Sequence, residues 1–273
     1  MGAPIPVKVV VVTMFETGAD SGDKAGEFQR WNERQKLDTV FSAPHMHHNI
    51  HLNADTGVLG IVTGMGTANA AASVMALGLD PRFDLSKAYW LVAGISGFDP
   101  ADASLGSVAW AEYLVDGDLA HEIDAREIPD DWDTGYFPLF SQGPGDQERL
   151  SYSLGEVFQL NPGLANWAFN FTKDIDLPDH PTLEATRKLY VKHPVGQRKP
   201  FVLKGDQLAA MTFWHGEVMN DWANEWTDYW TQGKGEFVSS AMEDTGTYQS
   251  ITYLHNAGKV DKINTRRINQ LLE

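Results

Sequence analysis

The segment VLGIVTGMGTAN, residues 58–69, decides how this chain folds. Its first five residues are apolar, and the chain then turns at Thr63, Gly64, Met65 and Gly66. The segment 70–79 that follows is rich in alanine, the residue with the highest helix propensity. A strand that ends in a glycine turn and leads into a helix is typical of a wound α/β sheet.

Other segments repeat this pattern along the chain. The β-branched run KVVVVT at 8–13 indicates a strand buried on both faces of a sheet. Strands are also expected at 88–93, 106–115, 201–203 and 237–240, and helices near 28–40, 164–173, 183–190, 214–230 and 245–256. The spacing of Trp222, Trp226 and Trp230 predicts one buried helical face.

Two regions depart from this pattern. It weakens between about residues 116 and 200, which we interpret as an insertion in a single domain covering 1–273. The final segment, 258–273, is rich in Lys, Asn and Arg, and we expect no strand there.

The composition narrows the classes of partner. With 37 acidic and 21 basic side chains, the formal net charge is −16, which repels nucleic acid and anionic lipid. No apolar run reaches the roughly 18 residues of a membrane helix, so we expect no direct membrane insertion. A small neutral or cationic ligand fits this chain better than a polyanion.

The cellular compartment stays open. Cysteine is absent, which is compatible with either the cytosol or an oxidising periplasm. We expect a periplasmic or secreted protein if a signal peptide has been removed ahead of Met1, and otherwise a cytoplasmic one.

Ligands of wound α/β folds bind outside the carboxyl ends of the strands. The turns expected to converge there follow Val12, Val62, Ala93, Leu203 and Ser240. The turn at 63–69 also begins a helix, whose positive end and open backbone N–H groups favour oxygen acceptors. Simple chain reversal explains such glycines equally well.

Three of these segments together resemble the nucleoside phosphorylase and nucleosidase superfamily: VLGIVTGMGTAN at 58–69, AGISG at 93–97 and SSAMED at 239–244. LKGDQL at 203–208, MTFWHG at 211–216 and AMEDTGT at 241–247 are more closely similar to the purine nucleoside permease (NUP) family. The resemblance covers about residues 7–260. It implies a three-layer α/β sandwich with a mixed, mostly parallel central sheet, a purine nucleoside as ligand, and a homo-oligomer.

The resemblance also implies how the nucleoside is held. Met242 and Glu243 would meet the ribose, with the Glu243 carboxylate accepting hydrogen bonds from both vicinal hydroxyls. Alternatively, Glu243 caps the helix that begins near Thr245. The base would lie against Ala93, Gly94 and Leu208, with Trp214 as an aromatic wall.

The chemistry remains open between two classes. The strand 89–92 has no basic residue for a phosphate, and Glu16 in the first loop would oppose an anion, so hydrolysis is favoured over phosphorolysis. In hydrolysis Glu16 would orient water, and Asp206 is the fallback acid, although it could equally be a structural loop carboxylate. The alternative is a non-catalytic component of a nucleoside uptake system.

Neither a cofactor nor a metal is expected. Gly64-Met65-Gly66 lacks the third glycine of the dinucleotide fingerprint and follows the second strand rather than the first. His45, His47, His48 and His51 form the densest histidine group. Their spacing suits no helical ligand pair and no carboxylate partner is apparent, so a solvated surface loop is favoured over zinc.

Overall fold

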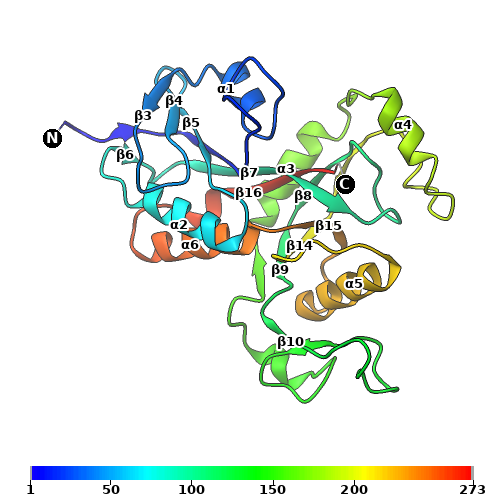
Figure 1. The fold of residues 1–273 in the computed structure, drawn as a ribbon. Helices are drawn as coiled ribbons and strands as arrows, with labels where there is room; N and C mark the ends of the chain where they lie inside the picture. The colour runs from blue at the N-terminus through cyan, green and yellow to red at the C-terminus, as the bar shows by residue number, and fades with distance from the viewer. Residues whose placement is uncertain (1, 272–273) are drawn as a thin grey trace.

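A computed structural model describes residues 2–271 of the chain, with the backbone alone described at 266–271. The described residues form a 12-stranded mixed sheet, two small two-stranded sheets and helices packed against the large sheet (Figure 1). The strands are β1 (Ile5–Pro6), β2 (Val9–Thr13), β3 (Thr39–Phe41), β4 (Ile50–Asn53), β5 (Val58–Val62), β6 (Phe83–Asp84), β7 (Tyr89–Phe98), β8 (Val108–Ala111), β9 (Tyr113–Asp116), β10 (Ala120–Glu122), β11 (Tyr136–Pro138), β12 (Val157–Gln159), β13 (Val202–Lys204), β14 (Asp206–Ala209), β15 (Phe237–Ala241) and β16 (Thr265–Leu271). The helices are α1 (Gln29–Gln35), α2 (Thr67–Gly78), α3 (Pro162–Thr172), α4 (Pro181–Arg187), α5 (Glu217–Thr231) and α6 (Asp244–Asn256), with short 3-10 turns at Glu148–Ser151 and Lys262–Asn264.

The large sheet combines parallel and antiparallel pairs: β2, β5, β7 and β16 are parallel neighbours, whereas β7 and β15 are antiparallel. The path runs β12-β9-β14-β15-β7-β2-β5-β4-β3, with β16 between β7 and β8 and with β13 beside β8. β2 is parallel to both β5 and β7, and Val10, Val11 and Val12 are almost fully buried. The predicted α/β class with a mixed sheet is therefore confirmed.

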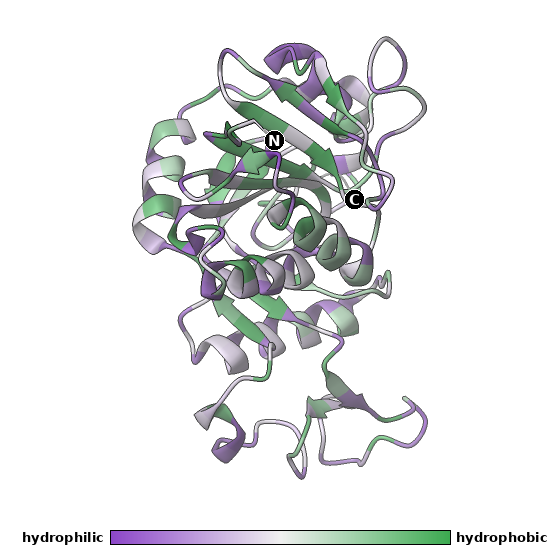
Figure 2. Ribbon diagram, turned by 90° about the vertical axis from the view of Figure 1, so that its left-hand side faces the viewer, coloured by the Kyte–Doolittle hydropathy of each residue, from purple (hydrophilic) through white to green (hydrophobic). Residues whose placement is uncertain are grey.

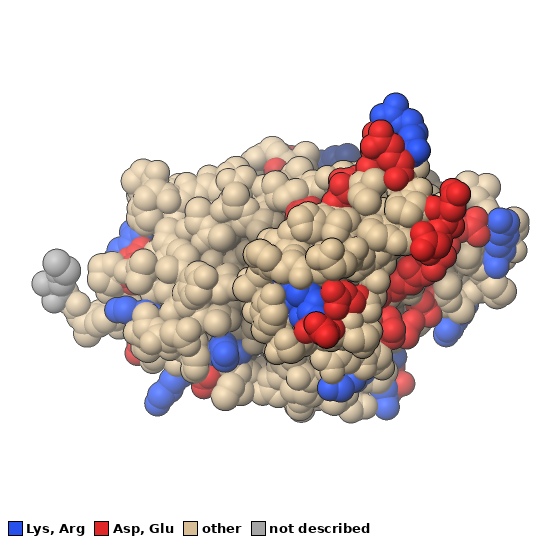
Figure 3. Space-filling model, turned by 90° about the horizontal axis from the view of Figure 1, so that it is seen from below, with Lys and Arg blue, Asp and Glu red and all other residues tan. Residues whose placement is uncertain are grey.

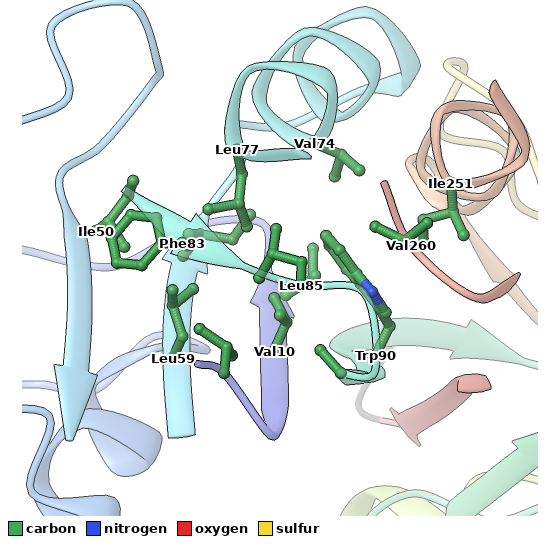
Figure 4. Close-up of a cluster of buried hydrophobic side chains, with 14 of the residues drawn as sticks. Val10, Ile50, Leu59, Val74, Leu77, Phe83, Leu85, Trp90, Ile251 and Val260 are labelled. Carbon is green, nitrogen blue, oxygen red and sulfur yellow. The ribbon is translucent and has the colours of Figure 1, made fainter. Parts of the chain in front are cut away.

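The main core lies between the sheet and the helix pair α2 and α6 (Figure 4). Leu59 and Trp90 from the sheet meet Leu77 from α2 and Ile251 from α6. Gly78 allows the two helices to approach, because a Cβ at that position would lie only 2.1 Å from Cδ1 of Leu254. Full burial of one large apolar side chain contributes about 1.5–3 kcal/mol, so this cluster dominates the packing.

A second core lies between α5 and the strands β9, β14 and β15. Trp222, Trp226 and Trp230 are each 4% exposed and form one face of α5, as the spacing of four predicted. This cluster fixes α5 beside the carboxyl ends of β14 and β15, which later form one wall of a cavity.

The segment between 116 and 200 holds several separate features. β10 and β11 pair with each other and extend below the main body (Figures 1 and 2). β12 then returns to the large sheet and pairs with β9, and α3 packs on β8 and β13. Only part of this segment therefore leaves the sheet.

The structure corrects five local expectations. The helix near 28–40 ends at Gln35, because Lys36 adopts a left-handed conformation (φ 52°) and the following TVF forms β3. The expected turn at 94–97 is part of β7, which continues to Phe98. The single strand at 106–115 is two strands, β8 and β9, and the turn at 205–208 mostly belongs to β14.

The fifth correction has the largest consequence, because the final segment does contain a strand. β16 is parallel to β7 from Thr265 opposite Trp90 to Leu271 opposite Ser96, and antiparallel to β8. Its sequence TRRINQL has no apolar periodicity, so the pattern gave no strand signal. The backbone groups of β7 and β8 pair with it regardless of side-chain type.

In the part of the chain that the structure describes, no helix combines the length and the apolar character needed to cross a membrane.

Asp206 ties together the amino ends of three neighbouring parallel strands. Its carboxylate accepts hydrogen bonds from the N–H groups of Glu112 (2.8 Å) and Tyr113 (2.7 Å) at β9 and of Glu236 (2.9 Å) before β15. Burial raises the pKa of Asp206, and the three N–H groups oppose this rise. Asp206 therefore stabilises the packing of β9, β14 and β15 at their amino ends.

We predict that Asp206→Ala destabilises the fold. Each buried N–H group left without an acceptor costs about 1–3 kcal/mol, so we expect the free energy of unfolding to fall by at least about 2 kcal/mol in urea titrations. Asp124→Ala, which removes an exposed carboxylate, serves as the control. Normal stability of Asp206→Ala would remove the structural role and return Asp206 to the list of candidate acids.

Candidate functional site

A cavity of about 690 Å³ opens where the end of β7 meets the carboxyl ends of β14 and β15. Its volume lies within the range of about 300–1,000 Å³ that is typical of small-molecule sites. The wall includes the end of β7, the loop after β14, the start of α5 and the residues at the end of β15: Gly97, Phe98, Ala210, Thr212, Phe213, Trp214, Asn220, Asn224, Ser240, Ala241 and Met242.

Glu243 follows the cavity wall directly and is only 5% exposed. Its Oε1 accepts a hydrogen bond from the N–H of Gly66 (2.8 Å), and its Oε2 lies 3.3 Å from the N–H of Met242. Glu243 stands at the N-cap position of α6, as the alternative expected, but its side chain makes no capping hydrogen bond there. The carboxylate bonds to the turn after β5 instead.

Contacts around Glu243 join loops that are distant in sequence. Thr67 Oγ1 donates to the carbonyl of Met242 (2.8 Å), and the N–H of Thr67 lies 3.0 Å from the sulfur of Met211. Gly66 has φ 91°, and a Cβ there would lie 2.8 Å from Met211 Cε. The turn after β5 and the loops after β14 and β15 thus form one unit.

The first glycine turn contributes mainly by its backbone. Thr63 is fully buried and its hydroxyl donates to the carbonyl of Gly64 (2.9 Å), while Ser73 donates to the carbonyl of Thr63 (2.9 Å). Gly64 has φ 83° and lies against His47, and Met65 is exposed. This turn brings the N–H of Gly66 to Glu243.

The other residues expected around the base are dispersed. Trp214 lies in the cavity wall, where it packs against Trp222 and Phe237. Ala93 and Gly94 pair with β16, and the cavity meets β7 further along, from Gly97. Leu208 is fully buried in the α5 core, and Asp206 begins the same strand, where its carboxylate accepts a hydrogen bond from the N–H of the cavity-lining Glu236.

The cavity is strongly acidic. Asp99, Asp102, Glu217, Asp221 and Glu236 line it, and no lysine or arginine is among its described lining residues. The face of the molecule seen from below also carries a broad group of acidic side chains (Figure 3). A negatively charged ligand would meet unfavourable potential at this cavity.

Two of these carboxyl groups differ in their surroundings. Asp99 is 2% exposed and accepts hydrogen bonds from the amides of Asn220 (2.9 Å) and Asn224 (2.8 Å). Burial raises the pKa of Asp102 to about 6, with further contributions from the charges of Asp99 and Glu236. Sequence inspection missed Asp102, since a lone Asp after a strand carries no pattern.

The chain matches the description purine nucleoside permease (NUP) over residues 6–268. The chain belongs to the purine nucleoside permease (NUP) family. A probable purine nucleoside permease of Schizosaccharomyces pombe is 31% identical over 254 residues, which are 90% of this chain and 71% of that protein. A purine nucleoside permease of Candida albicans is 32% identical over 260 residues, 93% of this chain and 62% of the relative, so this NUP chain spans under two thirds of that protein.

Solved structures confirm the nucleoside phosphorylase-like fold of this NUP chain. A 5'-methylthioadenosine/S-adenosylhomocysteine nucleosidase from Colwellia psychrerythraea, in complex with adenine, has a TM-score of 0.52 at 14% identity, covering 97% of this chain and 81% of that one. A futalosine hydrolase of Helicobacter pylori has a TM-score of 0.53 at 11% identity, covering 97% and 89%. At these identities the likeness establishes the fold alone.

In this NUP-family chain, Glu16 stabilises the loop between β2 and α1. The Glu16 carboxylate accepts hydrogen bonds from the N–H groups of Thr17, Gly26 and Gln29. These bonds close the loop before α1. Glu16 therefore lies in the predicted loop, but these hydrogen bonds give it a structural role.

Glu27 occupies the position at the strand ends that the sequence argument gave to Glu16. Its Oε2 accepts from the N–H groups of Met14 (2.7 Å) and Phe15 (3.4 Å) after β2, and its Oε1 accepts from the N–H of Ile95 in β7 (2.7 Å). Backbone N–H groups converging in this way would otherwise favour an anion. Here the Glu27 carboxylate takes the place of such an anion.

The histidine segment divides into two parts. His45 and His47 are exposed, as expected for a surface loop. Nε2 of His48 and Nε2 of His51 both lie near the carboxylate of Asp20, at 3.0 Å and 3.3 Å. Burial lowers the pKa of His51, opposed by the charge of Asp20.

We predict that Glu27→Ala allows inorganic phosphate to bind at the ends of β2 and β7. The substitution releases N–H groups and removes a like charge, which at about 4 Å and an effective dielectric constant of 20 opposes an anion by about 4 kcal/mol. Calorimetric titration with phosphate should show binding at least about tenfold tighter than for the wild type.

Asp38→Ala is the control, because it removes an exposed carboxylate just after α1 and leaves the hydrogen bonds of the loop that carries Glu27 intact. Equal phosphate affinity in Glu27→Ala and the wild type would show that Glu27 does not block an anion site.

Proposed function

We propose that this NUP-family chain binds a purine nucleoside, with the ribose at Glu243 and the base in the adjoining cavity. The observation that carries this proposal is the buried Glu243 carboxylate, fixed by the N–H of Gly66 beside the cavity-lining Met242. Vicinal hydroxyls bind well to a carboxylate, and charge-assisted hydrogen bonds contribute about 1.5–3 kcal/mol. A preorganised carboxylate loses little entropy when it binds them.

The shape and charge of the cavity suit a neutral base. Trp214 and Phe213 provide aromatic surface, and such surface packs well against a purine ring. The acidic lining favours neutral or cationic ligands over nucleotides, whose phosphates would be repelled. We therefore propose a nucleoside rather than a nucleotide as the ligand.

We further propose that the bound nucleoside is cleaved at its N-glycosidic bond by water. Water adds to C1' of the ribose while the bond to the base nitrogen breaks, and the ribose carries positive charge in the transition state. Glu243 and the acidic surroundings stabilise that charge. Glu27 at the strand ends replaces the Glu16 of the sequence-based scheme as the carboxylate that orients water.

Asp102 is our candidate for the acid that protonates the departing base. It lines the cavity, and a carboxyl group with a pKa of about 6 is partly protonated near neutral pH. Asp206 is a weaker candidate because its carboxylate already accepts hydrogen bonds from three backbone N–H groups. The proton taken from water returns to solvent through the orienting carboxylate.

The competing proposal is a non-catalytic nucleoside-binding component of an uptake system. The contacts of Glu16 support it, since this carboxylate holds backbone N–H groups of its own loop. The names of the fungal relatives, purine nucleoside permease, fit it as well. In that case the same Glu243 and cavity bind the nucleoside without turnover.

Two further expectations remain proposals. The superfamily resemblance supports a homo-oligomer. A periplasmic or secreted location is proposed if a signal peptide has been removed, and a cytoplasmic one otherwise; a chain without cysteine suits either compartment.

We predict that Glu243→Gln weakens nucleoside binding about 10- to 150-fold, the equivalent of about 1.5–3 kcal/mol. Adenosine, inosine and guanosine are titrated calorimetrically, and products are separated by chromatography with and without phosphate. The wild type should release free base and ribose without phosphate.

Glu184→Gln, an exposed change of the same kind on α4, is the control and should bind as the wild type does. Unchanged affinity in Glu243→Gln would refute the ribose assignment. Tight binding without release of base would establish the binding component, and phosphate-dependent ribose 1-phosphate would contradict hydrolysis.

We predict that cleavage falls as pH rises above about 6, because Asp102 must be protonated to donate and loses its proton above its pKa. Asp102→Asn should lower kcat by about 100-fold or more and flatten this pH dependence. Initial rates of base release between pH 5 and 8 measure both effects.

Asp130→Asn, an exposed change in the extension below the sheet, is the control. A wild-type rate and pH profile in Asp102→Asn would exclude Asp102 as the acid.

A further inference from the structure

The loop before α1 and the segment that enters β4 meet at a cluster of three possible metal ligands. Asp20, His48 and His51 each offer one donor atom, and these atoms all lie within 4.8 Å of one another. α1 and β4, the elements that flank the cluster, lie at the top of Figure 1. This cluster is separate from the cavity.

The contact between the His48 ring and the Asp20 carboxylate is favourable only if a proton or a metal ion lies between them. His48 Nδ1 lies 3.0 Å from the carbonyl oxygen of Asn49, and since a carbonyl only accepts, Nδ1 carries the hydrogen. In the neutral ring, Nε2 then presents a lone pair to Asp20 Oδ1, also an acceptor, at 3.0 Å. A positive charge between these atoms, from a proton or a metal ion, is needed to make this contact favourable.

The distances suit a tetrahedral ion. Zinc binds His nitrogen and carboxylate oxygen at about 2.0–2.2 Å, which places neighbouring ligand atoms about 3.3–3.5 Å apart. The separations from the Asp20 oxygens to Nε2 of His48 and His51 are 3.0 Å and 3.3 Å. The bond from His48 Nδ1 to a backbone carbonyl is also the usual outer contact of a metal-binding histidine.

The surrounding residues hold the three ligands in place. Phe28 is fully buried and packs on both rings, with centroid distances of 5.9 Å to His48 and 5.2 Å to His51. The carbonyl of Asp20 accepts a hydrogen bond from Asn32 of α1 (2.9 Å). The side chain of His51 is 7% exposed, whereas those of His48 and Asp20 are 27% and 28% exposed, which leaves a path for an ion and for water as a fourth ligand.

We propose that Asp20, His48 and His51 form a binding site for a divalent transition-metal ion of the zinc type. The sequence argument disfavoured a metal because no carboxylate was apparent near the histidines, and the fold supplies one from 28 positions before His48. The ion would fasten the loop that carries Glu16 and Glu27 to β4. This proposal is independent of the nucleoside proposal.

The test is calorimetric titration of chelator-treated, untagged full chain with zinc chloride at pH 7.5. We expect one zinc ion per chain, a higher melting temperature with zinc, and at least about tenfold weaker binding in Asp20→Ala and in His48→Ala. Both substituted side chains are partly exposed, so these variants should keep the fold, which circular dichroism checks. Cobalt titration should give the visible bands of a tetrahedral site.

His45→Ala is the matched control, because it removes an exposed histidine from the same segment and should leave zinc affinity unchanged. The proposal is overturned if the wild type takes up no stoichiometric zinc, or if Asp20→Ala and His48→Ala bind it as tightly as the wild type. In either case the cluster is a histidine–aspartate ion pair.

Discussion

β7 is the strand on which both the fold and the candidate site depend. Its first part pairs with β2 and β16, and its last residues, Gly97 and Phe98, pair with β15 in the opposite sense. Gly97 allows a close approach at this crossing, because a Cβ there would lie 2.6 Å from Oγ of Ser240 and the serine side chain would have to move. β7 therefore brings β15, and with it Met242 and Glu243, to the edge where β5 ends at its glycine turn. The cavity exists because two sets of strands are joined at this single position.

Carboxylates that accept backbone N–H groups account for much of the local order. Asp206 holds the amino ends of three strands, Glu27 joins β2 to β7, and Glu243 joins the end of β15 to the turn after β5. In each case a side chain from one element supplies acceptors that the backbone of another needs. The acidic excess of this chain is therefore partly structural, and it is not only a surface property. The same placement excludes anions from the positions where converging N–H groups would attract them.

The sequence predicted correctly those strands and helices whose apolar residues follow the pattern that burial imposes. β5 and the buried Trp face of α5 agree with expectation because burial imposes their patterns over consecutive residues. β16 was missed because its pairing uses backbone groups and its sequence is polar. The roles of Glu27 and Asp20 were missed for a related reason. The contact of Glu27 with β7 and the contact of Asp20 with His48 both join segments that are distant in sequence. The sequence could predict a role for Glu243, because the motif that carries the family resemblance is a short contiguous segment. It could not predict one for Asp102, whose raised pKa depends on burial and on the charges of Asp99 and Glu236.

The distribution of charge around the site limits what the bound molecule can be. Glu27 lies beside the end of β2 and Ile95 of β7, Glu243 follows β15, and five further carboxyl groups line the cavity, whose described lining has no lysine or arginine. A ligand that brought its own phosphate would have to overcome this potential. A nucleoside would not, and any step that develops positive charge on the ribose would be assisted by the same groups that repel phosphate. Under the proposed function, this one electrostatic arrangement would favour a neutral nucleoside in binding and water over phosphate in cleavage. Substitution of Glu243 tests the first effect, and substitution of Glu27 tests the second.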